Sequence, residues 1–225
     1  YWQELTDGVR FLVRQPLLRS VVAMVLVTNM FDAAKATVLL PVVAYRDLGG
    51  ASALGLLVGV MGGGAFAGSL LFGAVGHRLP RRITFVVAFA LAGGPPMFAL
   101  AAGPPLPALI VVYALAGLLA GAINPILGAV ELALVPPGMR ARVFGVIGAG
   151  CWAAMPVGAL AAGLTTTWFG TTATLVVIGC CYLLVTMVPL RGGPWRGLDA
   201  QPADPTAATP TPAPATAAPI GPGPT

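Results

Sequence analysis

Residues 107–134 read PALIVVYALAGLLAGAINPILGAVELAL, and this run decides the class of fold. Its only charged side chain is Glu131. An α-helix rises about 1.5 Å per residue, so about 20 apolar residues cross the ~30 Å hydrocarbon core of a bilayer. The run is therefore long and apolar enough to form one transmembrane helix.

Similar runs lie on both sides of this one. Of the 225 residues, 57% are hydrophobic and 8% are charged, and the mean hydropathy is +0.90. A soluble domain carries about 25% charged residues, so a water-exposed surface of ordinary charge density is excluded. The predicted fold class is an all-α membrane protein with six transmembrane helices. The other predicted spans are 18–45, 54–76, 83–102, 142–165 and 170–190.

The arginines give the expected orientation of these helices. Ten of the eleven lie on turns that share one side of the membrane, and only Arg46 lies on the other side. Short cytoplasmic loops retain Lys and Arg, so both ends of the chain are expected in the cytoplasm. This topology and contact with anionic lipid explain the net charge of +5, with no nucleic-acid partner. The ten are Arg10, Arg14, Arg19, Arg78, Arg81, Arg82, Arg140, Arg142, Arg191 and Arg196.

Three regions are expected along the chain. Residues 1–17 are predicted to form a cytoplasmic interfacial or linker helix, because apolar side chains recur there at helical spacing between charged ones. Residues 18–190 are predicted to form the six-helix transmembrane bundle. Residues 191–225 are rich in Pro, Ala and Thr and are predicted to be a disordered cytoplasmic tail. The first residue is Tyr1 rather than Met, as expected of a fragment.

Three polar residues, Asn29, Asp32 and Lys35, recur every three positions in the first span. This spacing places them on one stripe of a helix. A charge deep in a span costs at least about 2.5 kcal/mol unless it faces a partner or a cavity, so Asp32 and Lys35 are expected to pair. Two interpretations stay open. Asp32 contacts substrate or takes up a proton, or the pair is purely structural, and Lys35 has the further option of reaching the outer interface.

The fourth span adds Asn124, Pro125 and Glu131. Asn124 is a candidate to hydrogen-bond a substrate or a neighbouring helix. Pro125 removes a backbone donor, which favours a kink. Glu131 lies seven residues after Asn124 and is expected to pair with Arg140 or Arg142 at the cytoplasmic surface rather than to bind a proton.

Two loops carry recognisable motifs. Residues 73–82 read GAVGHRLPRR and resemble the G-x-x-x-D-R-x-G-R-R loop of the major facilitator superfamily, with His77 and Pro80 replacing the acidic residue and the second glycine. Residues 135–143 read VPPGMRARV and resemble the V-P-x-x-x-R-x-R-V segment of drug and siderophore exporters in that superfamily. Residues 8–19 are similar to the segment that leads into helix seven of those exporters. The matching loop residues are Gly73, Arg78, Arg81, Arg82, Arg140 and Arg142.

The resemblance covers about residues 4–190. It implies the C-terminal half, helices 7–12, of a twelve-helix secondary transporter whose N-terminal half is missing. It further implies a proton-driven exporter of a small amphipathic molecule, such as a drug or siderophore, that works by alternating access in a bacterial cytoplasmic membrane. The loop residues and Glu131 then hold helix ends together in cytoplasmic gating. The candidates to bind substrate or protons are Asp32, Lys35, Asn29 and Asn124.

Small residues recur every four positions in two spans. Such residues let helices approach closely, either in static packing or on surfaces along which the two halves of a transporter move. The second span has Gly55, Gly59, Gly63, Gly64 and Gly68, and the fifth has Gly150, Ala154, Gly158 and Ala162.

Other classes of function find little support. His77 is the only histidine and lies in a loop, so neither a Ser–His pair inside the membrane nor a metalloprotease site is expected. Cys151, Cys180 and Cys181 lie inside predicted spans, where they serve as small packing residues. No enzymatic activity, cofactor or metal is predicted. The remaining alternative is a non-transporting membrane scaffold, or a fragment that needs its N-terminal half.

Overall fold

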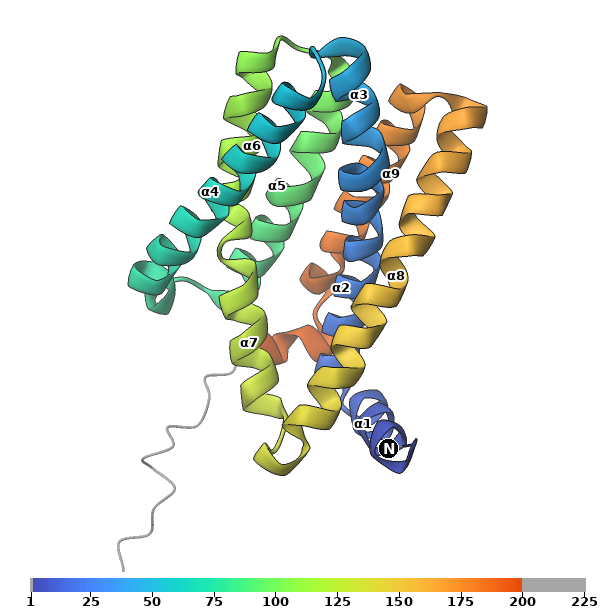
Figure 1. Ribbon diagram of the computed structural model, residues 1–225. Helices are drawn as coiled ribbons and strands as arrows, with labels where there is room; N and C mark the ends of the chain where they lie inside the picture. Colours follow the sequence, from blue (N-terminus) through green and yellow to red (C-terminus); the bar gives the residue numbers. More distant parts are fainter. Residues whose placement is uncertain (1, 200–225) are drawn as a thin grey trace, which may run out of the picture.

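The computed structural model describes residues 2–199, and residues 1 and 200–225 lie outside the described part. All regular structure in the described part is helical, and the helices form an elongated bundle (Figure 1). The elements are α1 (Trp2–Arg14), α2 (Pro16–Ala34), η1 (Lys35–Leu39), α3 (Leu40–Asp47), α4 (Ala51–Val75), η2 (Gly76–Arg78), α5 (Arg81–Ala102), α6 (Leu106–Ala120), α7 (Ile123–Leu134), η3 (Pro137–Met139), α8 (Arg140–Phe169), α9 (Thr171–Thr186), η4 (Val188–Arg191) and η5 (Gly193–Leu198).

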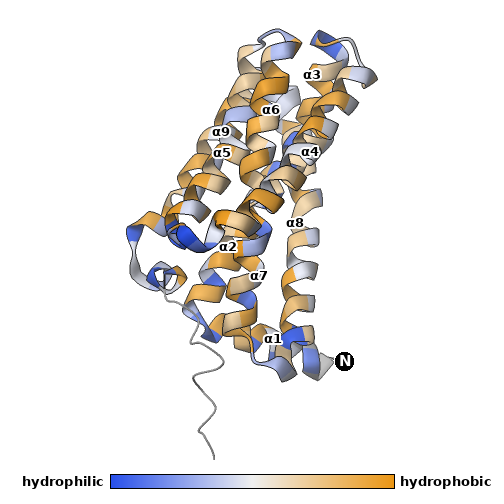
Figure 2. Ribbon diagram, turned by 90° about the vertical axis from the view of Figure 1, so that its left-hand side faces the viewer, coloured by the Kyte–Doolittle hydropathy of each residue, from blue (hydrophilic) through white to orange (hydrophobic). Residues whose placement is uncertain are grey.

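Six helical runs are long and apolar enough to cross a membrane, which confirms the six predicted spans. Their ends fall within five residues of the predicted ones. Apolar residues cover the length of the bundle, and polar residues gather at its two ends (Figure 2). The runs are Pro16–Asp47, Ala51–Arg78, Arg81–Ala102, Leu106–Leu134, Pro137–Phe169 and Thr171–Arg191.

The first run contains an irregular turn that the sequence analysis does not predict. Between α2 and α3, residues Lys35–Leu39 form one π-helical turn, in which the N–H of Leu40 donates to the carbonyl of Lys35. Pro41 follows directly, and a proline has no N–H and crowds the carbonyl four residues earlier. The wider turn accommodates this proline. It begins at Lys35, so the irregularity falls on the polar stripe of the span.

The fourth run is broken where Pro125 predicts a kink, and the structure confirms that prediction. α6 ends at Ala120 and α7 begins at Ile123. Since Pro125 has no N–H, the carbonyl of Gly121, four residues earlier, loses its helical partner. The Ser69 hydroxyl of α4 donates to this carbonyl oxygen at 2.9 Å. A side chain of another helix therefore satisfies the acceptor that the proline leaves free.

α4 packs along α6, backbone against backbone. A Cβ at Gly68 would overlap the carbonyl of Leu118, and a Cβ at Gly117 would overlap the carbonyl of Met61. Static packing is therefore the role of this part of the glycine stripe. Gly64 is also in this contact, because a Cβ there would lie 2.7 Å from the Ala114 carbonyl oxygen. The other three stripe glycines of α4, Gly55, Gly59 and Gly63, have no atom within 4 Å of a Cβ position and belong to an open face.

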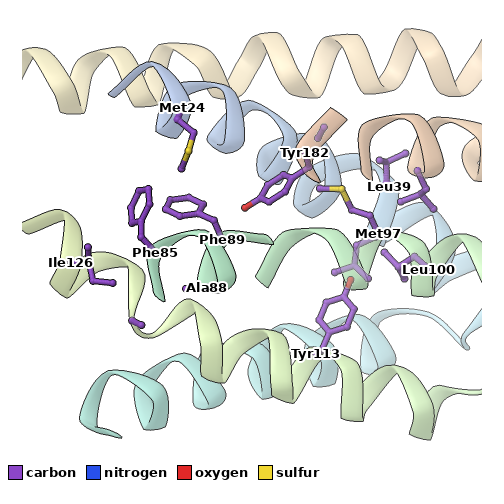
Figure 3. Packing of buried hydrophobic residues seen from close by; sticks show 14 of the residues in the cluster. Met24, Leu39, Phe85, Ala88, Phe89, Met97, Leu100, Tyr113, Ile126 and Tyr182 are labelled. Atoms are coloured by element: carbon purple, nitrogen blue, oxygen red, sulfur yellow. The ribbon is translucent and has the colours of Figure 1, made fainter. Parts of the chain in front are cut away.

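α2 packs on α8, and α5 packs on α9 and α6. Gly158 of α8 lies against the carbonyl of Met30 on α2, where a Cβ would overlap it. Aromatic rings fill the centre of the bundle, with Phe85 and Phe89 of α5 at a centroid distance of 4.8 Å. Tyr113 of α6 and Tyr182 of α9 enter this core from two further helices (Figure 3). The helices α2, α5, α6 and α9 thus contribute side chains to one hydrophobic core.

The described chain remains ordered beyond the predicted end of the bundle at residue 190. η5 turns back beneath the helices and buries Trp195 and Leu198, and the Trp195 ring lies 6.5 Å from the Phe85 ring. The first nine residues of the predicted tail, up to Asp199, therefore belong to the folded unit. The rest of that predicted tail lies outside the described residues.

Candidate functional site

Asp32 and Lys35 form an ion pair inside the first span, as the sequence predicts. Lys35 Nζ donates to Asp32 Oδ1 at 2.8 Å. The Lys35 side chain is 5% exposed, whereas the Asp32 side chain is 39% exposed. Lys35 therefore does not reach toward the outer interface, and that alternative is wrong. The carboxylate is the member of the pair that remains accessible.

Tyr182 of α9 supplies a second contact to the carboxylate. Its hydroxyl donates to Asp32 Oδ2 at 3.4 Å. The ring is 1% exposed and lies where a Cβ at Gly93 of α5 would overlap it. The glycine thus provides the space that lets this tyrosine cross the core toward α2. Three helices, α2, α5 and α9, together define the position of the Asp32 oxygen atoms.

Asp32 is one of the residues that line a cavity of about 490 Å³ between the α2–η1 segment and α8. Its walls are almost entirely apolar, with Asp32 as the one charged residue in the lining. Trp152 lies on the α8 side and is 75% exposed. An apolar wall with one convergent carboxylate suits a ligand that has both an apolar body and a polar or cationic group. The lining residues are Asp32, Ala33, Ala36, Thr37, Trp152, Met155, Pro156 and Ala159.

The two predicted asparagines lie apart from the ion pair. Asn29 is partly buried one turn before Asp32 on α2. Asn124 is exposed in the first turn of α7, directly after the break in the fourth run. Neither residue lines the cavity beside Asp32. Of the four predicted residues, the structure therefore brings together only Asp32 and Lys35.

The predicted pairing of Glu131 with Arg140 or Arg142 is wrong. Arg140 instead donates to the carbonyls of Leu132 and Val135, at 3.0 and 3.2 Å, and so caps the C-terminus of α7. Cations near helix C-termini are favoured by the helix dipole. Glu131 is partly buried and has no ion pair among the described residues.

Arg142 binds the carboxylates of α1. Its guanidinium lies 3.3 Å from Glu4 Oε1 and 3.9 Å from Asp7 Oδ2. Gly8 faces the same turn, because a Cβ there would come within 3.0 Å of the Arg142 carbonyl oxygen. The second arginine of the VPPGMRARV motif therefore joins the amphipathic helix α1 to the start of α8.

In the 73–82 loop, Arg82 is the residue that joins helix ends. Its guanidinium donates to the carbonyls of Pro189 and Leu190, both at 2.9 Å, and it lies 3.9 Å from Asp199 Oδ2. Arg82 thus contacts a helix C-terminus and a carboxylate within this six-helix unit.

The other motif residues of that loop make fewer contacts. Arg78 donates to its exposed neighbour His77 at 3.2 Å. Arg81 has no hydrogen bond or ion pair in the part of the chain that the structure describes. A Cβ at Gly73 would meet no atom within 4 Å. Only Arg82 among these residues bridges two helical runs.

Sequence reasoning missed three side chains that complete these contacts. Tyr182 places a hydroxyl group in the middle of an apolar span. The signal that could have found it is the Gly93–Gly94 pair, because two glycines on a facing helix leave space for a large ring. Trp152 sits in the middle of the fifth span, away from the interfaces where tryptophan is enriched. Asp199 lies directly before the proline-rich part of the predicted tail and gave no signal of its own.

The comparisons with known proteins agree with this architecture. Residues 22–220 match the family described as the Major Facilitator Superfamily. The chain belongs to this superfamily. It is therefore a multi-pass membrane protein of a transporter family, and the membrane-enzyme alternative is set aside.

Curated relatives are multidrug efflux pumps of mycobacteria. The chain is 30% identical over 195 residues to the multidrug efflux pump Tap of Mycolicibacterium fortuitum, covering 87% of this chain and 47% of that protein. It is 30% identical over 198 residues to the pump of the same name in Mycobacterium tuberculosis H37Rv, covering 88% and 47%. The chain thus spans about half the length of these relatives. No solved structure matches it significantly.

Proposed function

We propose that this chain is the C-terminal half of a proton-driven exporter of small amphipathic molecules, and that Asp32 is its coupling residue. The single observation that carries the proposal is Asp32 itself: its side chain is paired with the buried Lys35, remains 39% exposed, and belongs to a residue that lines an apolar cavity. An ionisable group inside a membrane span is costly, and where it faces a cavity it marks an ion or substrate path.

The mechanism follows from what the carboxylate binds. In the resting pair, Lys35 and Tyr182 both donate to Asp32. A proton that arrives through the cavity neutralises Asp32 and weakens both bonds, while a cationic or donor group of a substrate needs the ionised form. Proton and substrate are therefore mutually exclusive at Asp32. This exclusion is the requirement for exchange of one against the other under alternating access.

The missing partner is the N-terminal half. The relatives are about twice as long as this chain, and a six-helix unit supplies one wall of a cavity that lies between two halves. The open face of α4 at Gly55, Gly59 and Gly63 is available to such a half. We place both ends of this chain in the cytoplasm of a bacterial cell, from the ten-to-one division of arginines.

The break between α6 and α7 supports the same function. Asn124 and Pro125 follow it directly, and Arg140 caps the far end of α7. A short helix held at its end and hinged at a proline can tilt as a unit. We assign α7 as the moving element on the cytoplasmic side, with Asn124 exposed at the hinge to contact substrate.

The test restores the upstream half and measures substrate-driven proton movement in proteoliposomes. Asp32→Asn keeps the size and an acceptor oxygen but cannot exchange a proton. Asp47→Asn is the matched control, because Asp47 is also an ion-paired aspartate of this first run but is exposed beside Arg46 at its end. We expect coupled flux to be lost and substrate binding to be weakened in Asp32→Asn, because the neutral amide mimics the protonated carboxyl. Both are expected to be kept in Asp47→Asn, with membrane insertion retained in both variants.

The other outcomes are equally clear. Unchanged proton flux in Asp32→Asn makes the Asp32–Lys35 pair purely structural and overturns the coupling role. No flux in any of the proteins, with intact insertion, favours the membrane-scaffold alternative. If the unmodified protein transports substrate without proton movement, the protein is an exporter driven by another gradient, and the proton-driven mechanism is overturned.

A further inference from the structure

Three arginines surround a cavity of about 360 Å³ where α1 meets the start of α8. Arg10 and Arg14 come from α1 and Arg142 comes from α8, and Asp7 is the one acidic residue in the lining. Two apolar side chains, Phe11 and Met139, complete the walls. The site lies at the base of the bundle, beside α1 (Figure 1). None of the functions proposed above uses this cavity.

Two of the three arginines have no counter-charge. Arg142 is held by Glu4 and Asp7. Arg10 and Arg14, by contrast, make no ion pair or hydrogen bond with the described residues. They are four residues apart on one helix, so their side chains lie on the same face and repel each other. An anion placed between them would offset this repulsion and would give both arginines a counter-charge.

An exposed apolar row lies next to the arginines. Val9 and Val13 precede Arg10 and Arg14 by one position each, and they are 42% and 52% exposed. One residue is a turn of about 100° on a helix, so the valine row runs alongside the arginine row. Cations beside exposed apolar side chains on one helix are typical of the boundary between lipid headgroups and acyl chains.

We propose that this cavity binds the phosphate of an anionic phospholipid, with Arg10 and Arg14 as its ligands. Guanidinium groups bind phosphate oxygens in pairs, which accounts for two unpaired arginines side by side. The glycerol and the first acyl carbons then lie on Phe11 and Met139, beside the valine row. A free phosphate or another soluble anion would leave the exposed side chains of Val9 and Val13 without an apolar partner. The occupant is therefore a lipid of the leaflet that faces the arginine-rich end of the bundle.

The test uses the whole chain in detergent micelles with equal amounts of phosphatidylglycerol and phosphatidylcholine. Native mass spectrometry then gives the ratio of the two lipids retained. Each arginine near an anionic surface is worth about a fivefold preference, so Arg10→Gln/Arg14→Gln is expected to lower the ratio about 25-fold. The control is Arg78→Gln/Arg191→Gln, two exposed arginines outside the cavity, which should lower the ratio much less than the cavity variant does.

Two further measurements keep the proposal falsifiable even if the double variant does not fold. Arg10→Lys/Arg14→Lys keeps both charges and should retain most of the preference. In the unmodified chain, added salt should release phosphatidylglycerol before phosphatidylcholine. An equal loss in the control variant, or an unchanged ratio in Arg10→Gln/Arg14→Gln, overturns the site. Displacement of the lipid by inorganic phosphate at equal concentration shows that the cavity selects phosphate alone, and overturns the lipid assignment.

Discussion

Two contacts between helices of the bundle are built differently. One joins α4 to α6, and the other joins α2 to α8 and α9. In the first, the backbones touch, because Gly68 and Gly117 carry no side chain where the helices cross. In the second, an ion pair, a tyrosine hydroxyl and a cavity of about 490 Å³ lie at the helix surfaces. The first leaves no room for a ligand. The second is equally close where Gly158 of α8 meets the Met30 carbonyl, but it keeps room beside Asp32.

This difference separates a part of the bundle that is built from close helix packing from the part for which we propose a role in transport. In lipid, apolar helices gain little from contact with one another beyond close packing, so small residues give the tightest contact. A buried charge weakens a bundle unless it is fully paired. Replacing a buried ion pair by well-packed apolar residues is often neutral or stabilising, which supports the proposal that the Asp32–Lys35 pair has a function other than stability.

The largest expected effect is on the glycine contact. In Gly68→Val the new side chain meets the backbone of Leu118, which cannot move aside, and we expect the unfolding free energy in micelles to fall by about 3 kcal/mol. Gly59→Val, the same change on the same helix at an open position, should have little effect. Equal losses in the two variants would mean that the α4–α6 contact is not what limits stability.

The ion pair should respond asymmetrically to loss of its two members. Asp32→Ala leaves Lys35 charged and 5% exposed, so we expect a loss of about 2 kcal/mol in unfolding free energy. Lys35→Met leaves a carboxylate that keeps the Tyr182 hydroxyl and reaches the cavity, and should cost less than about 1 kcal/mol. Equilibrium unfolding of both variants and the double variant measures the coupling. A larger loss for Lys35→Met would contradict the assigned exposure.

The bond between α4 and the broken run gives a smaller effect. Ser69→Ala removes the donor to the Gly121 carbonyl and should cost about 1 kcal/mol. Pro125→Ala restores an N–H four residues after Gly121, so in that background the loss of the serine should cost little. A double-mutant cycle of unfolding free energies compares the two. Equal costs of Ser69→Ala with and without Pro125 would show that the proline does not free this carbonyl.

The two buried tyrosines give the smallest expected difference. Both are 1% exposed, but Tyr182 donates to Asp32 and the Tyr113 hydroxyl has no partner among the described residues. Tyr182→Phe should lower the unfolding free energy by about 0.5 kcal/mol, whereas Tyr113→Phe removes an unsatisfied buried group and should be neutral or stabilising. Thermal unfolding of both variants measures the difference. Destabilisation by Tyr113→Phe of the same size would show that its hydroxyl has a partner.

Much of the fold is predictable because each transmembrane helix is a local feature of the chain. Length and hydropathy alone place all six spans, and Pro125 predicts the break in the fourth, since the loss of an N–H depends on no distant residue. The π turn at Lys35–Leu39 is missed although Pro41 is visible. A proline can kink, break or widen a helix, and the choice depends on what surrounds it.

The candidate site is predictable only where its residues are neighbours in sequence. Asp32 and Lys35 are one turn apart, so helical spacing alone predicts their ion pair. Arg142 was expected near Glu131 on the same grounds, and it binds Glu4 and Asp7 instead. Those carboxylates lie more than a hundred residues earlier in the chain, and no periodicity connects them to α8.

The sequence by itself determined the membrane class, the number of helices and the position of one charge pair in the first of them. These properties follow from residue hydropathy and from spacing along a single helix, which act over a few turns. The tertiary structure alone decided that the carboxylate of that pair is open to a cavity, that Tyr182 reaches it across Gly93, and that α1 is fastened to α8. These contacts join separate helices, and the relative rotation of packed helices is decided by side-chain fit over their whole length rather than by any local pattern.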